Sequence, residues 1–312
     1  MNAVVVPTPA RRVDVLGADR VSYLEDVTSQ HLADVPVGHV RSALYLDPKG
    51  SPLAMFEVAV LGDRLALLNP DEAVATTVIE MLGGRTFLLD ARFVPTDDEV
   101  VAVRGEDAAT VISAAGLTAV PGRCRVAGDL LIISRDGGVD VAGPAVALAN
   151  ARQAMLDAGA TEGAAADLDR WRVEHGVPAW GSEVVAPHLP EEAGVLPTHV
   201  HLAKGCYPGQ EAVARMWMLG RPRRRLAIVT PTGDPLEAGW QAGSGRRAVT
   251  VTSVSPEGDR ALAYVPGDAT PGDAFGDEAG ATGIKVVALV GDDPNPPGHA
   301  PGVTRRRDRP RT

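Results

Sequence analysis

The sequence predicts an α+β fold that ends in a small antiparallel β-barrel. A strand, a glycine and a helix follow one another at residues 12–27, and the same order returns at residues 100–115. Strands and helices in such an order are typical of α+β architecture. Beyond residue 225, short β-rich runs alternate with glycine, which favours a barrel of antiparallel strands. With 312 residues, 45% of them hydrophobic, the chain is long enough for two or three domains.

The first part of the chain shows clear start and stop signals. Asp19 and Pro70 stand where helices commonly begin, and the apolar runs between the helices have the length and spacing of strands. We expect the following elements, in chain order: a strand at 12–17, a helix at 19–27, a hairpin of strands at 42–46 and 53–60 around a turn at 47–50, a strand at 64–68 and a helix at 70–82.

The second part of the chain again alternates predicted strands and helices, and it becomes β-rich after residue 225. Gly159 and Gly176 follow two apolar-periodic stretches and are expected to stop helices. We expect strands at 100–105, 130–133 and 139–142, helices at 107–115, 144–158 and 167–176, and barrel strands at 226–229, 248–252, 260–264 and 284–290. Residues 292–312 are rich in proline, glycine and arginine, so we expect a disordered tail there.

Charge and cysteine content limit the function classes. A formal net charge of −10 argues against indiscriminate nucleic-acid binding, and we assign no RNA role to the arginines of the tail. The chain has no apolar run of about 18 residues, no signal segment and only two cysteines, Cys124 and Cys206. We therefore expect a cytoplasmic protein, with both cysteines as thiols and no membrane partner.

The densest group of chemically useful residues is the segment 204–211, Lys-Gly-Cys-Tyr-Pro-Gly-Gln-Glu. Its glycines and proline indicate a shaped loop, which in the simplest interpretation is a tight turn around a buried thiol. Five arginines follow closely. They form either a solvated face or a seat for an anion, and they are Arg215, Arg221, Arg223, Arg224 and Arg225.

The order of residues in this segment resembles the signature of the YgfZ family of folate-binding proteins, which is related to the glycine cleavage aminomethyltransferase (T-protein, GcvT). The resemblance runs from about residue 13 to about residue 290. It implies a three-domain, GcvT-like ring of two ferredoxin-like α+β units and a C-terminal antiparallel β-barrel. The corresponding domains are a folate-binding unit at 1–97, a second unit at 98–220 whose segments can interleave with the first, the barrel at 221–291 and the tail at 292–312.

A second constellation, Arg172-x-Glu174 followed by Trp180-Gly181, could hold a pterin. A carboxylate can accept hydrogen bonds from the amino-pyrimidine edge of the ring, and an aromatic side chain can stack on its face. The resemblance implies that Glu174 and Trp180 do this for tetrahydrofolate or a derivative, with tryptophan where the aminomethyltransferases have tyrosine. Without the resemblance, Glu174 is a surface carboxylate paired with Arg170.

The remaining predicted site residues come from the signature and the basic strip. By resemblance the cofactor-binding set is Arg172, Glu174, Trp180, Lys204, Gly205, Tyr207, Gly209, Gln210, Glu211, Arg215 and Arg225. Cys206 is the functional thiol, and nearby cations such as Lys204 and Arg215 can stabilise a thiolate. His199 and His201 precede this loop and are either polar surface or metal ligands. We predict no metal site.

One departure from the aminomethyltransferases bears on activity. Those enzymes carry an acidic pair after a hairpin glycine, but residues 50–56 of this chain contain no carboxylate before Glu57. Leucine or alanine cannot assist a proton transfer. We therefore do not expect one-carbon transfer in glycine cleavage. The resemblance to the YgfZ family implies instead a folate-binding accessory protein that supports assembly or repair of iron–sulfur enzymes, including tRNA-modifying ones, and that need not turn over a substrate itself. We expect it to be a monomer. The alternatives are a one-carbon transferase that uses Glu57 or Asp47, and a thiol-dependent hydrolase that uses Cys206.

Overall fold

The computed structural model describes residues 3–299 except 136, 220–221, 277–281 and 294. The chain divides into two compact units. The first contains Met1–Tyr45 and Ala54–Leu168, and the second contains Leu46–Leu53 and Asp169–Thr312. The second unit thus takes the tip of a hairpin from the N-terminal part of the chain. None of the helices in the described part is long and apolar enough to cross a membrane.

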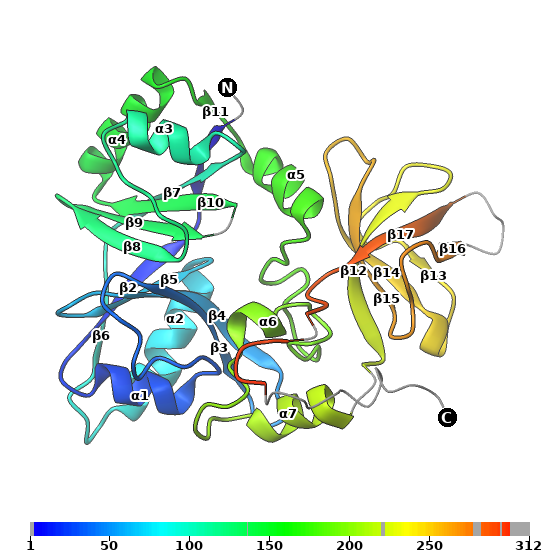
Figure 1. Cartoon of the computed structure of the whole chain (residues 1–312), viewed down its shortest axis with the longest axis horizontal. Coiled ribbons are helices and arrows are strands. Elements are labelled where there is room, and N and C mark those ends of the chain that lie inside the picture. The colour runs from blue at the N-terminus through cyan, green and yellow to red at the C-terminus, as the bar shows by residue number, and fades with distance from the viewer. Residues whose placement is uncertain (1–2, 136, 220–221, 277–281, 294, 300–312) are drawn as a thin grey trace. The chain divides into compact units, whose positions relative to one another are not determined.

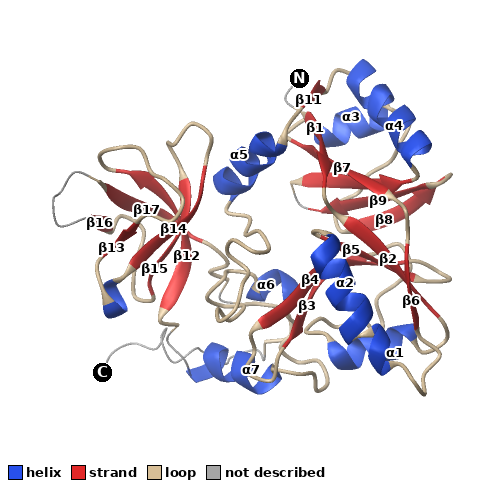
Figure 2. Ribbon diagram, turned by 180° about the vertical axis from the view of Figure 1, so that it is seen from behind, coloured by secondary structure: helices blue, strands red, loops and turns tan. Residues whose placement is uncertain are grey.

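The first unit contains two sheets (Figures 1 and 2). One has the order β11-β1-β7-β10-β9-β8, and its strands are β1 (Val4–Thr8), β7 (Glu99–Arg104), β8 (Arg123–Ala127), β9 (Leu130–Arg135), β10 (Gly138–Gly143) and β11 (Thr161–Glu162). The other has the order β3-β4-β5-β2-β6, and its strands are β2 (Arg11–Leu16), β3 (Val40–Leu46), β4 (Pro52–Val60), β5 (Leu65–Asn69) and β6 (Arg92–Pro95).

The first two strands of the chain belong to different sheets of the first unit. Strand β1, from the very start of the sequence, runs antiparallel to β7, with Val5 opposite Val103, and parallel to β11. Strand β2, only a few residues later, belongs to the other sheet, where Val13 lies opposite Leu67 of β5. The first strand of the chain is therefore part of the sheet formed mainly by residues after 98.

Helices cover these sheets, and the bounds of the α-helices lie within two residues of the predicted ones. They are α1 (Arg20–Val27), α2 (Glu72–Met81), the short 3-10 helix η1 (Gly83–Arg85), α3 (Ala108–Ala114) and α4 (Ala145–Asp157). At the start of α2 the Asp71 side chain accepts a hydrogen bond from the Val74 amide at 2.8 Å, which caps the helix. Met155 and Leu148 of α4 pack with Ile112 of α3 onto Val141 of β10.

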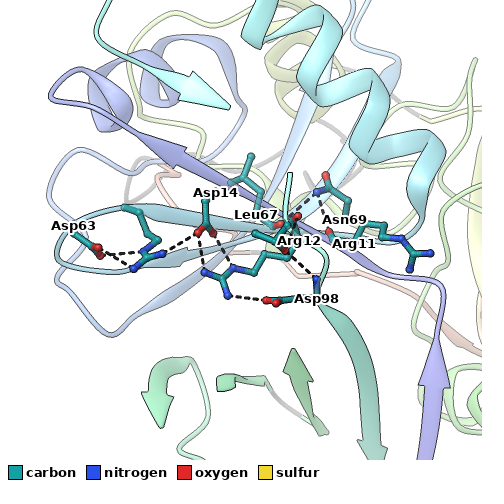
Figure 3. Close-up of polar contacts among 9 residues, drawn as sticks. Arg11, Arg12, Asp14, Asp63, Leu67, Asn69 and Asp98 are labelled. Atoms are coloured by element: carbon teal, nitrogen blue, oxygen red, sulfur yellow. Dashed lines mark hydrogen bonds and ion pairs between the residues drawn. The ribbon is translucent and has the colours of Figure 1, made fainter. Parts of the chain in front are cut away.

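The two sheets of this unit share an apolar layer, which joins Leu68 and Ala59 of one sheet to Leu131 and Ile133 of the other. Ion pairs lie beside this layer. Arg12 forms a two-pronged bond to Asp14 at 2.7 and 2.8 Å and reaches Asp98 at 2.8 Å, as Figure 3 shows. Because each of the three guanidinium nitrogens donates to a carboxylate, the charge of Arg12 is paired at the sheet.

The second unit is built on a six-stranded antiparallel sheet with the order β13-β14-β15-β12-β17-β16. The sheet curls nearly into a barrel around an apolar core that includes Val229, Val251 and Ala263. Its elements are β12 (Arg224–Pro231), β13 (Gln241–Ala242), η2 (Gly245–Arg247), β14 (Val249–Val254), β15 (Ala261–Pro266), β16 (Ala274–Gly276) and β17 (Gly283–Leu289). Helix α5 (Ala165–His175) spans the boundary between the units, and α6 (Leu196–His199) and α7 (Gln210–Leu219) precede the sheet. The predicted α+β class with a C-terminal antiparallel β-structure is confirmed.

The first residues of the predicted tail make contacts within the second unit. Asp292 pairs with Arg225 at 2.7 Å, and the Pro297 carbonyl accepts a hydrogen bond from the Leu202 amide at 2.9 Å. Gly298 packs closely against His201 and Ala203. The disorder of the tail stays a prediction. Residues 300–312, with the rest of the prediction, lie outside the described residues.

Candidate functional site

The signature forms a folded loop that leads into helix α7. The Gln210 amide donates to the Tyr207 carbonyl at 3.2 Å, and its side-chain Nε2 donates to the Lys204 carbonyl at 3.3 Å. The Val213 amide then donates to the Gly209 carbonyl at 3.2 Å. Gln210 therefore closes the loop on itself, and the first turn of α7 begins directly behind it.

Two side chains of the signature point inward. Lys204 is only 7% exposed, and its Nζ lies 5.0 Å from the centroid of the Tyr207 ring. At this distance the ammonium is attracted by the face of the ring. Tyr207 is equally buried, and burial raises the pKa of its phenol to about 12, so the ring stays neutral. This pair forms the interior of the loop.

The signature glycine Gly209 is required by a close backbone approach. Its φ is +82°, and a Cβ placed there would lie 2.6 Å from the Asp47 carbonyl oxygen and 2.9 Å from the Cα of Gly50. Gly50 itself has a φ of +86°. The Asp47 carboxylate holds this turn by accepting the amides of Lys49 and Ser51, each at 2.8 Å. The loop thus lies directly on the tip of the β3–β4 hairpin.

In contrast, the outer part of the loop is open. Cys206 is an exposed free thiol, and a Cβ on the neighbouring Gly205 would meet nothing within 4 Å. Glu211 and Arg215 on α7 are exposed as well. The simple interpretation of a tight turn around a buried thiol is therefore wrong for Cys206.

The other cysteine, Cys124, is buried in the first unit. Its thiol donates to the His39 carbonyl at 3.3 Å. Burial raises the pKa of this thiol to about 11. The two cysteines therefore differ sharply in their access to reagents.

Among the described residues there is no group of three or more histidine, cysteine or acidic side chains that could hold a metal ion.

Arg172, predicted to bind the cofactor, is held inside the second unit. Its Nη1 donates to the Glu183 carboxylate at 3.2 Å, its Nη2 to the Ser253 hydroxyl at 2.7 Å and its Nε to Asp169 at 2.7 Å. These bonds tie α5 to strand β14. Arg172 therefore anchors α5 within the second unit.

Glu183 is a residue that the sequence analysis missed. Its side chain is 0% exposed, and its carboxylate accepts bonds from the Ser253 hydroxyl at 2.5 Å and the Ala179 amide at 2.9 Å besides that of Arg172. Its carbonyl accepts the Tyr264 hydroxyl at 2.7 Å. Glu183 stands two residues after Trp180-Gly181. Its closeness to this predicted site was the sequence feature that could have drawn attention to it. We call Arg172, Glu183 and Ser253 the buried latch.

Glu174 and Trp180 lie between Arg172 and Glu183 in the sequence. Glu174 is exposed on α5 next to the fully buried Val173, and Trp180 is half-buried where the chain forms a bridge to Val184. The alternative partner of Glu174, Arg170, donates from its Nε to Glu257 at 2.7 Å. Glu174 thus presents a carboxylate to solvent, one turn of helix from an anchored arginine.

The basic strip after the signature separates into different environments. Arg225 is 8% exposed and pairs with Asp292, while Arg223 and Arg215 are exposed and Arg224 is half-buried. Arg221 lies outside the described residues. The strip is therefore no single face, and its exposed members are the ones accessible to an anion.

Comparisons with known proteins bear on the resemblance and on the fold. No family model matches the chain. The tRNA-modifying protein YgfZ of Vibrio atlanticus (strain LGP32) is 24% identical over 227 residues, which make up 71% of this chain and 68% of that protein. This chain resembles YgfZ. A crystal structure of glycine cleavage system aminomethyltransferase T from Bartonella henselae matches with a TM-score of 0.80 at 21% identity, covering 92% of this chain and 85% of that one. The fold is therefore that of an aminomethyltransferase T, and the resemblance to YgfZ that the signature predicts is confirmed.

Within that fold, the two carboxylates that could replace the missing acid are both engaged. Asp47 accepts two amides of its own turn. Glu57 is 7% exposed, accepts the Ser42 hydroxyl at 2.8 Å and pairs with Arg135 at 2.8 Å. Asp47 is therefore bonded to the backbone of its own turn, and Glu57 is bonded to a hydroxyl and a guanidinium.

Proposed function

We propose that this protein is a YgfZ-like accessory protein that binds tetrahydrofolate or a derivative and supports the assembly or repair of iron–sulfur enzymes, including tRNA-modifying ones. The observation that carries the proposal is the signature loop, which is closed by Gln210 and seated on a hairpin tip while its thiol stays exposed. A rigid loop that offers one accessible thiol suits a role in which the protein contacts a reactive partner. The similarity to a tRNA-modifying protein YgfZ also supports this proposal.

The proposed folate site lies in the second unit around Glu174 and Trp180. The carboxylate accepts hydrogen bonds from the pterin edge, and the indole stacks on the ring. The other predicted residues divide by their surroundings. Gly205, Glu211 and Arg215 are exposed and free to contact the ligand, whereas Arg172, Lys204, Tyr207, Gly209, Gln210 and Arg225 support the site from within.

Folate binding is tested by calorimetric titration of the full chain with tetrahydrofolate. We expect saturable binding that weakens at least about tenfold in Glu174→Gln, because a charge-assisted hydrogen bond is lost. Trp180→Ala should weaken it similarly. Glu257→Gln is the matched control, since it removes an exposed carboxylate of the same unit that pairs with Arg170. No binding by the unaltered protein, or equal loss in the control, would refute the site.

The role of the thiol is tested separately in cells that lack the protein. Cys206→Ala should keep its folate affinity but fail to restore the activity of iron–sulfur enzymes. Cys124→Ala serves as the control, because it removes the buried thiol. Full rescue by Cys206→Ala would eliminate the proposed role of the thiol and leave the folate site untouched.

A one-carbon transferase is the second candidate, and the shared aminomethyltransferase fold is what favours it. Its assay is the formation of methylenetetrahydrofolate from an aminomethylated lipoyl carrier. We expect no sustained turnover, because Asp47 and Glu57 are both occupied by donors. Turnover at enzyme-like rates that Glu57→Gln abolishes would overturn the accessory role in favour of the transferase.

A further inference from the structure

Three consecutive large apolar side chains lie on the surface of the first unit, between η1 and β6. Phe87 is 90% exposed, Leu88 85% and Leu89 43%. Single exposed apolar side chains are normal on a soluble protein. A group of neighbouring ones marks a contact surface more often than a random position does. We call residues 85–92 the apolar loop.

The structure holds this loop in place. The Leu89 amide donates to the Thr86 carbonyl at 2.9 Å, which makes a turn with Phe87 and Leu88 at its tip. At the far end, the Asp90 amide donates to the Asp19 carboxylate at 2.9 Å, and the Asp90 carboxylate accepts the Ala18 amide at 2.8 Å. Both ends of the turn are therefore fixed by hydrogen bonds to the rest of the unit.

The base of the loop is also packed. The Tyr23 hydroxyl donates to the Leu82 carbonyl at 2.7 Å, and the Tyr23 ring meets that of Phe93 edge-on at 6.2 Å between centroids. Gly17 has a φ of +107°, and a Cβ there would lie 2.0 Å from the Asp90 carbonyl oxygen. A loop so firmly seated cannot turn its apolar tip inward without breaking these contacts, so the exposure of the tip is built into the fold.

The charges beside the tip indicate what it meets. Arg85 and Arg92 flank the apolar side chains, and neither makes an ion pair with a residue that the structure describes. The nearby Asp90 turns its carboxylate to the Ala18 amide. Two guanidiniums without an ion pair in the described part thus flank the apolar tip in the sequence, on a chain whose formal net charge is −10. Such a surface is complementary to an apolar recess with carboxylates at its rim.

We propose that the apolar loop is a docking element for another protein, one that offers an apolar recess rimmed by Asp or Glu side chains. A second copy of this chain fits less well. A two-fold contact centred on the loop brings the same patch together twice, so Arg85 and Arg92 of one copy would meet those of the other. The apolar loop contains no residue of the proposed folate site, so loss of docking and loss of folate binding are separate outcomes.

The test places a photo-crosslinking residue at the tip of the full chain in its own cells, as Phe87→p-benzoylphenylalanine. The control is Val146→p-benzoylphenylalanine, which labels an apolar side chain that is 76% exposed on α4 of the same unit. We expect one protein to be captured from position 87 only, with the crosslink mapped to an apolar recess bordered by carboxylates. The capture should disappear when Arg85→Glu and Arg92→Glu are added.

The captured protein is then purified and its affinity measured. The double variant Phe87→Ala, Leu88→Ala should weaken the dissociation constant at least about tenfold at an unchanged melting temperature, because exposed side chains contribute little to folding. Equal capture from both positions, a recess without carboxylates, or capture of a second copy would each overturn the proposal. Sedimentation with anionic lipid vesicles that depends on Phe87 and Leu88 would overturn it in favour of a membrane surface.

Discussion

Removing the carboxylate at the centre of the buried latch should destabilise the second unit strongly. Glu183→Ala deletes a side chain that is 0% exposed and leaves the Ser253 hydroxyl, the Ala179 amide and one arm of Arg172 without their acceptor. Two neutral donors at about 0.5–1.5 kcal/mol each and one charged donor at about 1.5–3 kcal/mol sum to about 2.5–6 kcal/mol. Breaking a buried ion pair from one side costs about 3–5 kcal/mol in other proteins, which agrees. We take about 3–5 kcal/mol as the expected loss of unfolding free energy.

The assay follows from where the tryptophans lie. All four of them, Trp171, Trp180, Trp217 and Trp240, belong to the second unit, so fluorescence during urea unfolding reports on that unit. With a slope of about 2 kcal/mol per molar urea, the expected midpoint shift is about 2 M. Glu183→Gln keeps the shape and part of the hydrogen bonding, and should shift the midpoint by less. Glu257→Ala, which removes an exposed carboxylate, should leave it unchanged. If Glu183→Ala shifts the midpoint no more than this control, the latch does not stabilise the unit.

Two further results are expected from the signature loop. At pH 8, an aromatic disulfide reagent should modify one thiol in the native protein, Cys206, and a second only in denaturant, because burial raises the pKa of Cys124 to about 11; rapid modification of two thiols without denaturant contradicts this. Gly209→Ala should lower the urea midpoint by about 0.5–1.5 M, since its φ is +82° and its Cβ would press on Asp47, while Gly205→Ala should be tolerated in open space. Equal midpoints of these two variants would show that the loop is not held as described.

Local sequence signals predicted much of the secondary structure. Strands β5, β7 and β9 each carry a run of four apolar residues, and the burial of these runs explains why the pattern was clear. Strand β1 was missed. It contains Pro7, and its pairing partner around Val103 lies almost a hundred residues away, so no local pattern could announce it. Strands β6 and β8 were also missed, because β6 has only four residues and most residues of both strands are not buried.

The candidate site divides in a similar way. The glycine requirement of the signature could be predicted, because Gly209 and Gly50 do adopt conformations that favour glycine. The burial of the Lys204 and Arg172 side chains could not be predicted, since the sequence does not show which groups surround a charged side chain. The role of Glu183 could not be predicted for the same reason. Its partner Ser253 is 70 residues away, and only folding brings a hydroxyl to the buried carboxylate.

The hairpin tip that seats the signature loop has a consequence for how this chain can be divided. Strands β3 and β4 belong to a sheet of the first unit, yet the tip between them, Leu46–Leu53, is grouped with the second. A fragment that begins at residue 169 would carry Gly209 without the Asp47 carbonyl and Gly50 on which it lies. The signature loop would then lack the hairpin tip on which it packs, although every residue of the signature was present. Recombinant halves, domain exchanges with relatives and circular permutants therefore have to keep this hairpin with the C-terminal sequence, and a boundary chosen from sequence order alone would separate them.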